Sequence, residues 1–219
     1  MDALQGLIDV DTNIFLSINR MHTTFWDYFM SAYSGKWVWV PMYAALLYVM
    51  LRNFSWKVTL MCAIGVALTI TFADQVCATL IRPYVERMRP SNLNNPLSEM
   101  VHIVNNHRGG RYGFPSCHAS NTFGLAFYIF FVFRQKWLTF YMMAWAFLTC
   151  YSRVYLGVHY PGDLLAGTLV GALGAYLMYR LFIRVSGYKR TRQVKHANAP
   201  ILIGVLTIVG MLVYAVISY

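Results

Sequence analysis

Charged side chains are scarce in this sequence. Only 12% of its 219 residues are Asp, Glu, Lys or Arg, whereas 58% are hydrophobic. A water-soluble domain usually carries about twice that share of charge, and a soluble helical core would have to hide nearly every apolar run from water. The composition therefore favours a protein that lies in a lipid bilayer.

Patterns that bind metal ions are also missing. The sequence contains neither a C-x-x-C pair nor a carboxylate cluster of the metal-binding kind. We therefore predict no metal ion and no cofactor. The four cysteines lie in or at the edges of apolar runs and are expected to be buried thiols: Cys62, Cys77, Cys117 and Cys150.

The N-terminus has no basic residue before Arg20 and carries three aspartates, which argues against a cleaved signal peptide. Its apolar residues recur at roughly helical spacing. This pattern predicts a helix that lies in the membrane interface. The residues are Leu4, Leu7, Ile8, Ile14, Phe15 and Ile18.

Six apolar runs come near the ~20 residues that a transmembrane helix needs. They are residues 37–51, 58–81, 116–133, 137–152, 161–183 and 199–218. The predicted fold is all-α, a bundle of six transmembrane helices preceded by the interfacial helix. We predict one membrane domain over residues 1–219, with a core at about 37–185 and the last transmembrane helix at 199–218.

Acidic residues are absent from one side of this predicted bundle. The segments 52–57, 134–136 and 180–198 fall on that side and hold 10 of the 18 basic residues and none of the eight acidic ones. By the positive-inside rule this side is cytoplasmic, and in a bacterium the opposite side is the periplasmic face of the inner membrane. We interpret the basic 180–198 segment as a topology signal beside anionic lipid, and we predict no nucleic-acid partner. The basic residues are Arg52, Lys57, Arg134, Lys136, Arg180, Arg184, Lys189, Arg190, Arg192 and Lys195.

Three polar clusters separate the apolar runs, at residues 82–90, 115–118 and 152–163, and all fall on the outer face. Pro115-Ser116-Cys117-His118 begins a helix, where free backbone N–H groups attract anions. His159 lies four residues before Asp163, so that carboxylate can fix the tautomer of the imidazole. Alone, a histidine or an aspartate at a helix start is often only a cap. Together with the arginines they predict a site that binds a phosphate and cleaves its ester.

These clusters resemble the motifs of the type 2 phosphatidic acid phosphatase family, lipid phosphate phosphatases that share a helical fold with vanadium haloperoxidases. The family pattern is K-x6-R-P, then P-S-G-H, then S-R-x5-H-x3-D. This sequence has R-x6-R-P at Arg82, Arg89 and Pro90; P-S-C-H at 115–118; and S-R-x5-H-x3-D at Ser152, Arg153, His159 and Asp163. The resemblance extends over about 37–185.

Two positions depart from the family pattern. Arg82 replaces a lysine, which keeps the charge but presents a planar fork. Cys117 replaces a glycine, which keeps a backbone N–H but adds a side chain. Neither change removes a group that the chemistry requires.

The resemblance implies a metal-independent hydrolase. His159 would attack phosphorus and form a phosphohistidine, Asp163 would hold its tautomer, and His118 would protonate the leaving oxygen. The phosphate would be bound by Arg82, Arg89, Ser116, Cys117 and Arg153. Asp74, about two helical turns before Arg82, is predicted to pair with one of these arginines, because an unpaired carboxylate in a membrane is costly.

Several alternatives remain open from the sequence. The substrate could be lipid A, undecaprenyl diphosphate or phosphatidylglycerophosphate, and the basic 91–114 loop slightly favours a large anionic headgroup. That loop is either a lid over the headgroup or a plain solvated loop. A phosphotransferase with a lipid acceptor and an anion transporter are the competing functions, and the oligomeric state is not indicated. Gly167, Gly171 and Gly174 predict a close helix-packing face.

Overall fold

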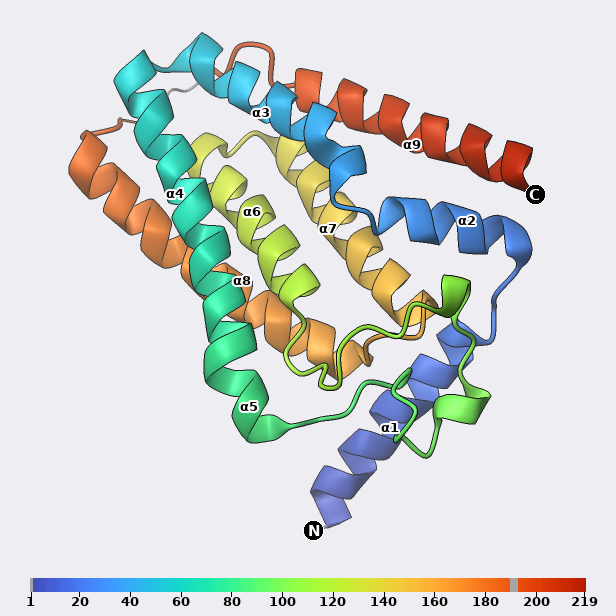
Figure 1. The fold of residues 1–219 in the computed structure, drawn as a ribbon. Coiled ribbons are helices and arrows are strands. Elements are labelled where there is room, and N and C mark those ends of the chain that lie inside the picture. The colour runs from blue at the N-terminus through green and yellow to red at the C-terminus, as the bar shows by residue number, and fades with distance from the viewer. Residues whose placement is uncertain (1, 190–192) are drawn as a thin grey trace.

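The structure is a computed structural model that describes residues 2–189 and 193–219, and helices joined by loops make up this part of the chain (Figure 1). Within these ranges no strand forms, and a single antiparallel bridge pairs Met88 with Tyr112. The predicted all-α class is thereby confirmed. The helices are α1 Asp2–Asn19, α2 Thr24–Tyr33, α3 Val40–Asn53, α4 Trp56–Gln75, α5 Arg82–Val85, α6 Cys117–Phe133, α7 Lys136–Tyr155, α8 Pro161–Ser186 and α9 Ala199–Ser218.

Each of the six apolar runs forms a helix. In the described part of the chain, three helical stretches are long and apolar enough to cross a bilayer: Trp56–Val85, Pro161–Ser186 and Ala199–Ser218. Cys117–Phe133 is a shorter apolar helix. The protein is therefore an integral membrane protein, and the count of six spans stays a prediction.

The second apolar run extends further than the sequence predicted. A π-helical turn, Val76–Ile81, joins α4 to α5, so the helix continues through Arg82 to Val85. Pro83 lies in the first turn of α5, where its missing N–H is tolerated, and Glu86 ends the helix in a left-handed conformation. Arg82 therefore lies in a helix, one residue beyond the predicted apolar run 58–81.

Helices α6 and α8 pack together most closely. A side chain at Gly167 would strike the Ser116 carbonyl, and one at Gly171 would strike the Ser120 carbonyl. Gly174 faces the Phe72 ring in the same way. The predicted packing face is confirmed, and it fixes the N-terminus of α6 against α8.

All three polar clusters lie at one end of the bundle, together with α1 and the long loop between α5 and α6 (Figure 1). The turns after α3, α6 and α8 lie together at the opposite end, as predicted for the segments 52–57, 134–136 and 180–198. Arg190 and Arg192 of the predicted topology signal lie outside the described residues. The N-terminal helix exists as predicted: Phe15 and Asn19 are buried, whereas Leu4 and Leu7 are exposed. Its position in the membrane interface stays a prediction.

Candidate active site

His159 and Asp163 form a buried pair at the junction of α7 and α8. His159 is 1% exposed and Asp163 is 0% exposed, and 3.2 Å separates Nδ1 of the imidazole from Oδ2 of the carboxylate. The same Oδ2 accepts the Tyr160 N–H at 3.1 Å, so Asp163 also caps α8. Capping and imidazole orientation, which the sequence presented as alternatives, are both properties of this one carboxylate.

Arg89 completes this pair from the loop after α5. Its Nη1 lies 2.7 Å from His159 Nε2 and 3.0 Å from the Val158 carbonyl oxygen. Since a guanidinium can only donate, Nε2 accepts, and Nδ1 carries the proton that faces Asp163. Burial, then the charges of Arg89 and Arg153, hold the pKa of His159 well below its usual value. His159 is therefore neutral at neutral pH, with the lone pair of Nε2 directed at Arg89.

The start of α6 contributes the second part of the site. Ser116 is fully buried, its Oγ accepts the Ala119 N–H, and its own N–H donates to the Asp163 carbonyl oxygen at 2.9 Å. Arg82 donates through Nη2 to the Pro115 carbonyl oxygen at 2.8 Å and to Cys117 Sγ at 3.1 Å. The Cys117 side chain is thus a neighbour of Arg82, and the first motif is joined to the second.

Arg153 and His118 complete the predicted set. Arg153 is 6% exposed and donates to Ser34 Oγ at 2.5 Å. His118 is half-buried in the first turn of α6, and within the described residues its imidazole makes no hydrogen bond. That leaves its ring nitrogens available to a bound molecule.

Three of the arginines each have a buried nitrogen without a hydrogen-bond partner in the described part of the chain. The Nε atoms of Arg82, Arg89 and Arg153 are buried and have no hydrogen-bond partner among the described residues. Burial lowers the pKa of Arg89 to about 10, and the charge of Arg82 adds to that effect. Buried donors without acceptors are costly. A tetrahedral oxyanion would supply both the missing acceptors and the missing negative charge.

A cavity of about 600 Å³ opens beside this cluster. Apolar residues of α3, α4, α6 and α7 form most of its lining, and several polar side chains also line it. His118 and Cys117 are among the lining residues, whereas His159 is not. The cavity therefore approaches the site from the His118 side. Its polar residues are Ser34, Lys36, Asp74, Cys117, His118, Asn121, Thr122 and Thr149.

Arg87 and Asp11 support the His159–Asp163 pair, and the motifs did not predict a role for either residue. Arg87 donates to Asp163 Oδ1 at 3.0 Å and to Asp11 Oδ2 at 2.7 Å, and its guanidinium lies 4.0 Å from the centre of the Tyr160 ring. Asp11 also accepts the Gly162 N–H at 2.7 Å. Helix α1 is thus tied to the start of α8. An acidic residue 76 positions from its arginine leaves no local signal in a sequence.

Asp74 differs from the prediction. Its carboxylate accepts from Asn121 Nδ2 at 3.5 Å, and no ion pair joins it to an arginine in the described residues. The prediction of an arginine partner was wrong, because Arg82 turns instead toward Pro115 and Cys117. Asp74 is among the residues that line the cavity, where water or a ligand can reach it.

Residues 62–187 match the model of the PAP2 superfamily. The chain belongs to this superfamily. The matched region contains all three polar clusters and helices α6, α7 and α8. The resemblance inferred from the motifs is confirmed.

The chain is 46% identical to a lipid A 4′-phosphatase of Bacteroides thetaiotaomicron, over 98% of this chain and 99% of the relative. It is 31% identical to a lipid A 4′-phosphatase of Porphyromonas gingivalis, over 86% of this chain and 78% of that relative. The crystal structure of Aquifex aeolicus LpxE shares the fold, with a TM-score of 0.57 and 20% identity over 77% of this chain and 94% of that one. This PAP2 protein is therefore similar to lipid phosphatases along nearly its whole length.

Proposed function

We propose that this PAP2 protein is a lipid A phosphatase that hydrolyses a phosphate monoester at the outer face of the inner membrane, without a metal ion. The observation that carries the proposal is the set of three unpartnered guanidinium Nε atoms around the His159–Asp163 pair. Three cations with buried, unpartnered donors suit a phosphate, and the neutral imidazole provides a nucleophile.

The chemistry follows from the hydrogen bonds of the pair. A bound phosphate draws the guanidinium donors of Arg89 onto its oxygens, which frees the Nε2 lone pair of His159 for attack on phosphorus. The P–N bond forms as the ester P–O bond breaks, and Asp163 accepts from Nδ1–H as positive charge develops on the ring. The arginines and the N–H groups at the start of α6 stabilise the charge on the equatorial oxygens.

His118 is proposed to donate a proton to the leaving oxygen of the lipid and then to remove one from the attacking water. That water attacks phosphorus, breaks the P–N bond and releases inorganic phosphate. This assignment agrees with the cavity, which is lined by His118 and not by His159. The lipid body lies in the cavity, and the phosphoryl group lies between the two histidines.

Lipid A is favoured as substrate because the two relatives described above are named lipid A 4′-phosphatases, one of them alike over nearly the whole chain. The lining of the cavity is largely apolar, which suits the acyl-chain part of a lipid. We accordingly propose that the 4′-phosphate of lipid A is the group removed.

The test uses purified protein in detergent with a chelator. Phosphate release is measured from lipid A, undecaprenyl diphosphate, phosphatidylglycerophosphate and phosphatidic acid, and mass spectrometry identifies which lipid A phosphate is lost. We expect release from lipid A, reduced by about 10²–10⁴-fold in His118→Ala and at least as much in His159→Ala. His107→Ala, an exposed histidine of the α5–α6 loop, is the matched control and should be fully active.

Three results would contradict the proposal. A strict requirement for magnesium would refute the metal-independent mechanism. Release from another lipid alone would reassign the substrate while leaving the site intact. Product formation that depends on a second lipid would identify a phosphotransferase.

A further inference from the structure

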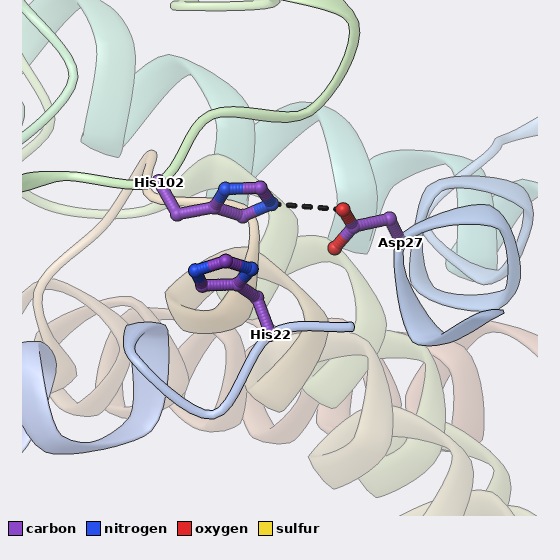
Figure 2. Close-up of side chains that lie close together, drawn as sticks. All are labelled: His22, Asp27 and His102. Atoms are coloured by element: carbon purple, nitrogen blue, oxygen red, sulfur yellow. Dashed lines mark hydrogen bonds and ion pairs between the residues drawn. The ribbon is translucent and has the colours of Figure 1, made fainter. Parts of the chain in front are cut away.

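A second group of ligand-type side chains lies outside the candidate active site. His22 from the α1–α2 turn, Asp27 from the first turn of α2 and His102 from the α5–α6 loop point toward one another (Figure 2). Each offers one nitrogen or oxygen atom, and these atoms lie within 4.8 Å of one another. His102 Nε2 is 2.8 Å from Asp27 Oδ2. The two imidazoles stack with their centres 3.7 Å apart and their planes 5° from parallel.

The surrounding residues hold two of these ligands in place. Asn19, itself fully buried, accepts the His102 N–H at 2.8 Å and donates to the His102 carbonyl oxygen at 3.0 Å. Tyr155 O–H donates to Asp27 Oδ1 at 2.8 Å, so one carboxylate oxygen is oriented by α7 and the other faces the histidines. Hydrogen bonds of this kind orient the ligands of metal sites. His22 is exposed and can rotate about its side-chain bonds.

Two imidazoles and one carboxylate are a donor set that suits zinc, which binds histidine nitrogen at about 2.0–2.1 Å in tetrahedral geometry. Ligand atoms around such an ion lie about 3.3 Å apart. The ligand atoms lie up to 4.8 Å apart and the two rings are stacked, so a shared ion requires the exposed His22 ring to swing out of the stack until its nitrogen points toward Asp27 and His102. The cluster offers three protein ligands and leaves a fourth position for water.

We propose that His22, Asp27 and His102 form a binding site for a divalent transition-metal ion, with zinc as the best fit. The ion would join three segments: the α1–α2 turn, α2 and the loop that also carries Arg89. Its role is to fasten that loop over the outer end of the bundle. None of the three ligands belongs to the residues proposed for hydrolysis, so the proposed hydrolytic step does not pass through this ion, and the two proposals can fail separately.

The experiment uses the full chain in detergent, purified with a tag that contains no histidine. Cobalt(II) is titrated as a visible probe of tetrahedral sites, and zinc is then added in competition. We expect one cobalt ion per chain, displaced by zinc, with binding lost or at least 10-fold weaker in His22→Ala and in His102→Ala. His107→Ala in the same loop should bind as the unmodified protein does, and so should His118→Ala with His159→Ala.

Thermal unfolding provides a second readout. Zinc at about 100 times its Kd should raise the Tm of the unmodified protein by about 5–10 °C, because it binds only the folded chain. The rise should shrink by about half or more in His22→Ala, because its binding is at least 10-fold weaker, and its Tm without metal should be unchanged because His22 is exposed. The absence of stoichiometric binding, or equal binding in His22→Ala, would overturn the proposal, even if lipid phosphatase activity is found. Activity that survives the chelator would leave it unaffected.

Discussion

Arg87 differs from the three arginines of the candidate phosphate site, because its guanidinium is already paired with two carboxylates of the protein. Arg82, Arg89 and Arg153 each keep a buried donor unpaired, whereas Arg87 is paired with Asp163 and Asp11. Its charge also stabilises the Asp163 carboxylate, which is fully buried. We therefore interpret Arg87 as a positioning residue that acts on His159 through Asp163.

Replacing Arg87 tests this interpretation. In Arg87→Gln, Asp163 Oδ1 loses its charged donor. The carboxylate then holds the tautomer of His159 through Oδ2 less firmly. We expect kcat to fall by about 10–100-fold with KM nearly unchanged, and the free energy of unfolding to fall by about 2 kcal/mol. Steady-state kinetics and thermal melts measure the two effects.

Arg111→Gln is the matched control for this substitution, since Arg111 lies in the same loop but is exposed and contacts the Tyr112 ring. It should leave kcat and Tm unchanged. If Arg87→Gln were less stable but had normal kcat well below its Tm, Arg87 would have a structural role only.

At the scale of helices, small residues decide how close α6 and α8 approach. Gly171 faces the Ser120 carbonyl and the Gly124 amide, and Gly167 faces the carbonyl of Ser116 at the start of α6. The packing therefore places the anion-binding end of α6 against the helix that carries Asp163. Stability and site geometry depend on the same contact.

A methyl group at Gly171 should separate the two helices. A Cβ there would lie 2.9 Å from the Gly124 nitrogen and closer to the Ser120 carbonyl, both parts of the backbone. We expect Gly171→Ala to lower the free energy of unfolding by about 1–3 kcal/mol, which corresponds to a Tm lower by roughly 2–10 °C, and to reduce activity with it.

Gly210→Ala in α9 is the comparison, because nothing lies within 4 Å of a Cβ at that position. It should leave Tm unchanged or slightly raised, since alanine favours helix. Equal melting temperatures for the two variants would mean that α6 and α8 are not in tight contact.

Helices and motifs could be predicted because their signals are local. Apolar runs define the helices, and the four-residue spacing from His159 to Asp163 brings both side chains together at the start of α8. The ties between distant segments could not be predicted: Asp11 with Arg87, Asn19 with His102, and Tyr155 with Asp27. Each joins residues that only the folded chain brings together. The π-helical turn before Arg82 was missed for a related reason, because no residue type marks it.

At the scale of the whole molecule, charge is divided between the two ends of the bundle. The end with the turns after α3, α6 and α8 is basic, whereas the end with α1 and the candidate active site holds acidic residues such as Asp11 and Asp163. Each basic residue near an anionic membrane surface strengthens the electrostatic attraction to that surface by about 1 kcal/mol. We therefore predict that the basic end is cytoplasmic and that the candidate active site faces the periplasm.

Cysteine labelling measures this orientation directly. The four native cysteines are replaced, with glycine at Cys117, and one new cysteine is placed at Leu93 in the outer loop or at Lys136 at the start of α7. Both positions are exposed. A maleimide that cannot cross membranes should label Leu93→Cys in intact spheroplasts and Lys136→Cys only after lysis. Retained phosphatase activity in both variants shows that the labelled protein is native. The reverse pattern would place the candidate active site in the cytoplasm, where it would meet lipid A before export instead of after it.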